Sequence, residues 1–121
     1  MFHHLIDAWN RKDEANILLV HYADLLDDLA AEMRRVATFL KIDVSANQID
    51  ELAPAASFRA MRANGENLAP DPAGALKDKS RFFRAGRSGG GSSILDAEAL
   101  SAYESRAAQA APPELLAWLH R

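Results

Sequence analysis

Residues 15–41 read ANILLVHYADLLDDLAAEMRRVATFLK, and the order of elements in this stretch decides the fold class. The apolar, partly β-branched run at residues 17–20 is typical of a strand that is buried on both faces, as in a parallel sheet. Asp24, or the pair Asp27 and Asp28, can cap a helix that follows the strand. The apolar face of that helix consists of Leu26, Leu29, Met33, Val36 and Leu40.

A short helix is expected before the strand, because Phe2, Leu5, Ile6 and Trp9 recur at helical spacing. Helix, strand and helix in this order form one slice of a doubly wound α/β fold with a parallel sheet. One strand cannot make a sheet, and no other stretch of the sequence has the pattern of a central strand. We therefore expect a mostly helical chain with one buried strand, which forms part of a larger α/β fold.

Three segments follow one another in what we interpret as a single partial domain over residues 1–121. Residues 1–64 contain the helix-strand-helix opening and two further short helices. Residues 65–93 hold all six glycines and are expected to form a long loop, which is unusual in a compact domain unless it is functional or disordered. Residues 94–121 are expected to form two helices, the first of them capped by Asp96.

The two short helices of the first segment have recognisable ends. Ser45 followed three residues later by Gln48 is a capping-box pattern and predicts a helix that starts near residue 46. A second helix is expected over residues 57–63. It should end at Asn64-Gly65 in a left-handed turn, since this pair is a common helix stop.

Composition excludes several classes of function. The chain has 121 residues, a net charge of −3 and no cysteine. A chain with this charge and no basic helical stripe is not expected to bind a nucleic acid polymer, and it has no thiol for a disulfide or a metal site. Adjacent His3 and His4 point in different directions on a helix, so no metal site is expected. The apolar runs are too short for a signal peptide or a membrane span, and we expect a cytoplasmic protein.

Positive charge is concentrated in the loop expected over residues 65–93, which we call the Gly-rich loop. Arginine suits phosphate because its planar guanidinium offers paired donors, and nearby glycines let backbone N–H groups approach an anion. Phe82 and Phe83 could anchor the loop or stack on a base. The residues alone leave two alternatives open, a phosphate-holding loop and a flexible, solvated basic loop. Between residues 77 and 87 the basic residues are Lys77, Lys79, Arg81, Arg84 and Arg87, against the single acid Asp78.

Three motifs carry a resemblance to a known family. Residues 80–90, SRFFRAGRSGG, resemble a segment of the sulfotransferases that use 3′-phosphoadenosine 5′-phosphosulfate, in which Phe-x-Arg-Lys-Gly-x-x-Gly lies on the nucleotide's 3′-phosphate. Residues 57–64, SFRAMRAN, resemble the family's Ser-Phe-Lys-x-Met-Lys-x-Asn. Residues 19–25, LVHYADL, resemble its strand that ends in Tyr-Glu-Asp-Leu. The motifs follow the family's order, and the resemblance implies the C-terminal segment of a P-loop-type doubly wound parallel sheet fold.

The resemblance also implies a site for the adenine of this donor. Phe58 and Met61 match the aromatic and methionine positions that pack around the base in the family. Ser57 and Tyr22 match positions that approach its polar edge. These four residues are the predicted adenine contacts.

The 3′-phosphate of the donor would lie on the Gly-rich loop. The resemblance places Arg84, Ala85 and Gly86 against this phosphate. Ala85 stands where the family has a lysine, so one positive charge is lost, and Arg87 is the candidate to replace it. Phe82 opens the motif and completes the predicted set of donor-binding residues.

Two catalytic elements of the family have no counterpart in the sequence. The family holds the sulfonate end of the donor on an N-terminal Gly-rich loop, and a central histidine acts as base on the acceptor. None of the four histidines lies in a matching context. We therefore expect a truncated segment that is inactive alone and is completed by an N-terminal sulfotransferase half or a second copy, for transfer to a hydroxyl or amine. The alternative is a non-catalytic helical interaction module that docks through Leu115, Leu116, Trp118 and Leu119.

Overall fold

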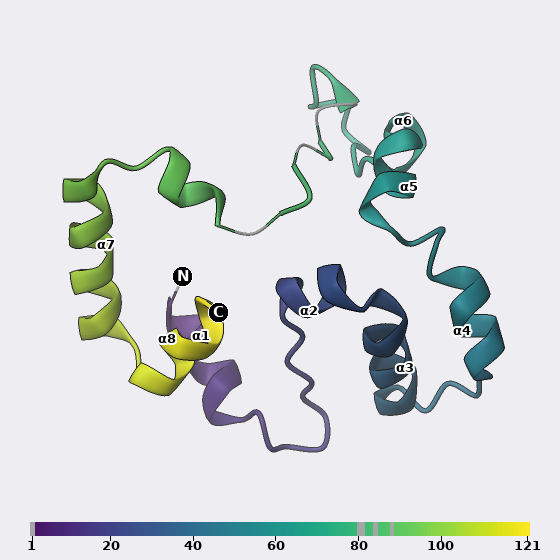
Figure 1. The fold of residues 1–121 in the computed structure, drawn as a ribbon, viewed down its shortest axis with the longest axis horizontal. Coiled ribbons are helices and arrows are strands. Elements are labelled where there is room, and N and C mark those ends of the chain that lie inside the picture. The colour runs from purple at the N-terminus through teal and green to yellow at the C-terminus, as the bar shows by residue number, and fades with distance from the viewer. Residues whose placement is uncertain (1, 80–81, 84, 88) are drawn as a thin grey trace. The chain divides into compact units, whose positions relative to one another are not determined.

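The computed structural model describes residues 2–79, 82–83, 85–87 and 89–121, with residues 92–93 described by their backbone only. The described residues are mainly helical, with long connections between the helices (Figure 1). In chain order the elements are α1 (Phe2–Asn10), α2 (Tyr22–Asp27), α3 (Leu29–Phe39), α4 (Ala46–Leu52), α5 (Phe58–Ala63), α6 (Gly65–Leu68), the 3₁₀ helix η2 (Gly90–Ser93), α7 (Ala97–Ala110) and α8 (Pro113–Leu119).

The chain divides into two compact units. One unit consists of residues 26–87, and the other combines residues 1–25 with residues 88–121. The first unit therefore contains the predicted adenine helix and most of the Gly-rich loop. The second unit brings the two ends of the chain together.

The structure corrects the prediction of a strand at residues 17–20. These residues are half-buried and have no regular secondary structure, and the described part of the chain contains no strand. A strand exists only where its backbone N–H and C=O groups pair with a neighbouring strand. The apolar pattern identified a buried segment, but the described chain offers no second strand to pair with it.

The helix expected after this segment forms as two helices. A short helix, α2, precedes Asp28, and α3 starts directly after it. The Asp28 carboxylate accepts a hydrogen bond of 2.9 Å from the backbone N–H of Ala31, so Asp28 is the N-cap that the sequence predicted as one alternative. α3 packs against α4, with Ala37 and Ile49 buried.

Replacing Asp28 with alanine should lower the free energy of unfolding by about 1 kcal/mol, because the Ala31 N–H loses its acceptor. Urea denaturation followed by circular dichroism measures this difference. Asp27→Ala removes the same charge one residue earlier and should change stability by less than about 0.5 kcal/mol. Equal losses in both variants would show that charge, and not the cap, is responsible.

The start of α4 and the end of α5, both in this unit, test two further predictions. Ser45 and Gln48 form the predicted capping box at the start of α4. α5 ends at Ala63 with Asn64 as its C-cap, as predicted. The left-handed turn expected at Asn64-Gly65 does not form, since Asn64 has φ −109° and Gly65 begins α6. Gly65 is buried in α6.

The unit formed by the two chain ends packs around α8. Leu115 is only 1% exposed, and the Trp9 and Trp118 rings lie with their centroids 5.8 Å apart. Asp96 caps α7 as predicted, by accepting a hydrogen bond of 2.8 Å from the Ala99 N–H. The C-terminal apolar stripe is therefore used inside this unit.

Candidate functional site

The central contact of the candidate site joins α5 to the Gly-rich loop. Gly86 has φ +61°, a backbone conformation that residues with a side chain rarely adopt. A Cβ atom at this position would lie 2.3 Å from Cδ1 of the Phe58 ring. Two features therefore require glycine at position 86: its positive φ angle and the close approach of its backbone to the Phe58 ring.

Aromatic rings continue this contact along the loop. Phe83 is half-buried and meets Phe58 edge to face, with ring centroids 6.3 Å apart. Phe82 meets Phe83 in the same way at 5.1 Å, and Phe82 is 49% exposed. Phe83 thus anchors the loop to α5, and Phe82 keeps a surface that a ligand can reach.

The first turn of α5 positions the other predicted adenine contacts. The Ser57 hydroxyl donates to the Pro54 carbonyl at 2.7 Å and accepts from the Ala60 N–H at 3.3 Å. Its proton is thus engaged, and the hydroxyl can only accept a further hydrogen bond. Met61 is half-buried and lies three residues after Phe58, so both side chains share one helix face.

The remaining predicted donor-binding residues are Tyr22, Arg84, Ala85 and Arg87, and the structure does not describe all of them. Ala85 and Arg87 are described and exposed, whereas Arg84 lies outside the described residues. Tyr22 is 45% exposed at the start of α2, in the other compact unit. The structure therefore brings Phe58, Phe82 and Gly86 into one cluster, and the contribution of Tyr22 stays a prediction.

Cations near this cluster are available to an anion. Arg59 and Arg62 on α5 are exposed, as is Arg87 in the loop. Within the described residues none of the three forms an ion pair, whereas Arg34 on α3 is paired with Asp50 at 2.7 Å. An unpaired guanidinium group offers paired donors that suit phosphate.

Replacing Gly86 with alanine tests the contact between the loop and α5. Gly74 is the matched control, because it has φ +66° but nothing lies within 4 Å of the position that a Cβ atom would take there. Gly74→Ala should cost about 1 kcal/mol of unfolding free energy from backbone strain alone. Gly86→Ala should cost a further amount of about 1–3 kcal/mol, since its methyl group would overlap the Phe58 ring. Equal losses by urea denaturation would contradict the contact.

A separate pocket of about 180 Å³ lies beside α3 and α4. None of the predicted donor-binding residues lines it, and Arg34 at its wall is already paired with Asp50. The pocket is therefore not part of the candidate site. Its lining residues are Arg34, Ala37, Thr38, Ile42, Val44 and Ala46.

Two other features are absent from the part of the chain that the structure describes. No described helix combines the length and apolar character that crossing a bilayer requires. Groups of three or more potential metal ligands are likewise absent among the described His, Asp and Glu side chains. The aromatic and glycine cluster at Phe58 and Gly86 remains the candidate site.

The family described as "Sulfotransferase domain" matches residues 1–110. The chain belongs to this family. Its resemblance to sulfotransferases, which the motifs around Phe58 and Gly86 carried, is thereby confirmed.

Similar proteins include curated sulfotransferases of bacteria and mammals. Over 99% of this chain, 39% of residues are identical to a glycolipid sulfotransferase of Mycobacterium bovis, and the same figures hold for one of Mycobacterium tuberculosis. An amine sulfotransferase of Oryctolagus cuniculus is 28% identical over 73% of the chain. The chain spans 37% of the length of the mycobacterial relatives and 31% of the rabbit one.

A solved structure supports the fold. The mouse sulfotransferase SULT7A1, crystallised with PAP, superposes with a TM-score of 0.70. The match covers 86% of this chain and 38% of the mouse chain, at 23% sequence identity. The helical arrangement described above is thus part of a sulfotransferase fold.

Of two contacts in the structure, the sequence analysis anticipated one in part and missed the other. Phe83 was expected, together with Phe82, to anchor the loop or stack on a base, and its ring connects Phe58 to Phe82. His21, expected at the end of a strand, is instead buried and bonded to Leu119. The Phe82-Phe83 pair offered a sequence signal for the first contact, but nothing in the sequence links residues 98 positions apart for the second.

Proposed function

We propose that this chain forms the adenine and 3′-phosphate side of the donor site of a sulfotransferase that uses 3′-phosphoadenosine 5′-phosphosulfate. The observation that carries the proposal is the approach of the Gly86 backbone to the Phe58 ring. This contact joins two family motifs that are well separated in the sequence. A flexible, solvated loop, the other alternative for this segment, would not require a glycine against an aromatic ring.

The adenine half of the site uses the α5 face. Phe58 and Met61 supply apolar surface for the base, and exposed Phe82 is free to stack on it. Ser57 accepts a hydrogen bond from the exocyclic amino group of adenine, because its own proton is directed to Pro54. Tyr22 serves as a further polar contact.

The phosphate half of the site uses the loop. Backbone N–H groups at Ala85 and Gly86 approach the 3′-phosphate without an intervening long side chain. Arg84 binds this phosphate with its guanidinium, and Arg87 supplies the charge that the family obtains from lysine at the position of Ala85.

The sulfonate end of the donor and the base for the acceptor come from outside this chain in our proposal. The chain is then one part of a sulfotransferase domain, completed by an N-terminal sulfotransferase half or by a second copy, and without activity alone. Stabilisation of the transferring group and proton removal from the acceptor both require positioned residues. The acceptor is a hydroxyl or an amine, in keeping with relatives named as glycolipid and amine sulfotransferases.

Isothermal calorimetry with two nucleotides tests the phosphate contact directly. The wild-type chain, alone and mixed with the N-terminal half of a sulfotransferase, is titrated with 3′-phosphoadenosine 5′-phosphate and with adenosine 5′-phosphate. Arg84→Ala should weaken binding of the first by about 10- to 100-fold, the loss expected for a charged hydrogen bond. Binding of the second should not change, since it lacks the 3′-phosphate.

Arg106→Ala is the matched control, because Arg106 is an exposed arginine on α7 in the other unit. It should leave both affinities unchanged. Equal losses for both nucleotides in Arg84→Ala, or no binding by the wild-type chain with the N-terminal half present, would overturn the proposal.

The helical interaction module is not favoured by the structure. Its docking stripe would have to be accessible, but Leu115 is 1% exposed and Trp118 packs on Trp9. These side chains stabilise their own unit.

A further inference from the structure

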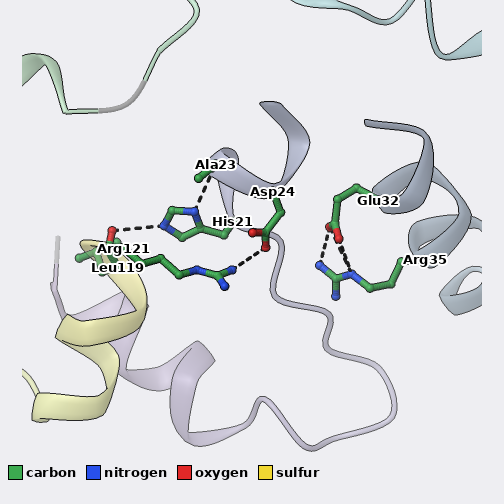
Figure 2. Close-up of polar contacts among 7 residues, drawn as sticks. All are labelled: His21, Ala23, Asp24, Glu32, Arg35, Leu119 and Arg121. Atoms are coloured by element: carbon green, nitrogen blue, oxygen red, sulfur yellow. Dashed lines mark hydrogen bonds and ion pairs between the residues drawn. The ribbon is translucent and has the colours of Figure 1, made fainter. Parts of the chain in front are cut away.

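His21 lies where the two ends of the chain meet. Its side chain is 8% exposed and faces the end of α8 (Figure 2). The ring nitrogen Nε2 is 3.3 Å from the Leu119 carbonyl oxygen, and Nδ1 is 3.0 Å from the backbone nitrogen of Ala23. One imidazole therefore contacts the first turn of α2 and the last turn of α8.

These two partners fix the tautomer of His21. The Leu119 carbonyl can only accept, so Nε2 must carry a proton to bond with it. The Ala23 N–H can only donate, so Nδ1 must be unprotonated. His21 is thus the neutral Nε2–H form, and its Nδ1 satisfies an amide that the first turn of α2 leaves without a helical partner.

Other contacts hold the same junction together. The Trp118 ring meets the His21 ring edge to face with centroids 5.0 Å apart. Arg121 forms an ion pair of 2.5 Å with Asp24, which belongs to the first turn of α2 (Figure 2). Hydrogen bond, aromatic contact and ion pair all connect the C-terminal end of the chain with residues 21–24.

We propose that His21 is a positioning residue of the donor site, which couples α8 to the first turn of α2. The inference rests on the proposed function, because α2 begins with the predicted adenine contact Tyr22. A helix of six residues is not stable by itself, and residues 17–20 before it lack regular structure. The orientation of Tyr22 therefore depends on its neighbour His21, which is held by both helices.

Two amide substitutions separate the two hydrogen bonds of His21. In His21→Asn the amide oxygen can still accept from the Ala23 N–H, but the side chain is too short to reach Leu119. In His21→Gln the amide nitrogen can reach the Leu119 carbonyl, but the acceptor next to the backbone is lost. If His21 couples the two helices, each variant should weaken binding of 3′-phosphoadenosine 5′-phosphate by about five- to tenfold.

His120→Asn is the matched control. His120 also lies at the end of α8, but it is exposed and its Nε2 bonds with the Tyr103 hydroxyl on α7 at 2.8 Å. This variant should bind the nucleotide like the wild type. Circular dichroism and thermal unfolding establish that each variant is folded at the temperature of the titration.

Long-range ¹H–¹⁵N NMR of the wild-type chain gives a readout that does not depend on any variant. We expect a proton on Nε2 and none on Nδ1 of His21. A proton on Nδ1 would overturn the coupling, since the bond to Ala23 could not then form.

The binding results distinguish this inference from the proposed function. Full affinity in either His21 variant, with a wild type that binds, would overturn the positioning role alone. No binding by the wild type with the N-terminal half present would overturn the donor site and the positioning role together.

Discussion

The close contact between the Gly86 backbone and the Phe58 ring is the constraint on which the candidate site depends. Residues 85–87 have no regular secondary structure, so helical hydrogen bonds do not place them. Their position relative to α5 comes instead from this contact and from the Phe83 ring that meets Phe58 edge to face. Because a methyl group at Gly86 would overlap the ring, packing against Phe58 explains the glycine at this position.

Local signals in the sequence predicted local structure well. The caps at Asp28, Ser45 and Asp96 are set by side chains three residues from the amides they bind, so a short window contains all the information. The prediction of a strand at residues 17–20 was wrong because a strand must pair with a second strand, and a local pattern contains no information about such a partner. The end of α5 before Asn64-Gly65 was predicted correctly, but the left-handed turn expected there does not form, because Gly65 begins α6.

The candidate site was predictable only through the family's motifs. Charge and glycine content could not distinguish a phosphate loop from a solvated one, whereas the motifs pointed to Phe58 and Gly86 as donor-binding residues, although not to the contact between them. The link between His21 and Leu119 was not predictable, since it joins residues 98 positions apart without any motif. The family match confirms the sulfotransferase assignment, and the residue roles remain our proposal.

The most direct test of the account is an intermolecular NOE experiment on the chain with bound 3′-phosphoadenosine 5′-phosphate, with the N-terminal sulfotransferase half present. The account predicts NOEs from the adenine protons to the ring of Phe58 and the methyl group of Met61. Adenine NOEs confined to residues outside α5 and the Gly-rich loop would contradict it.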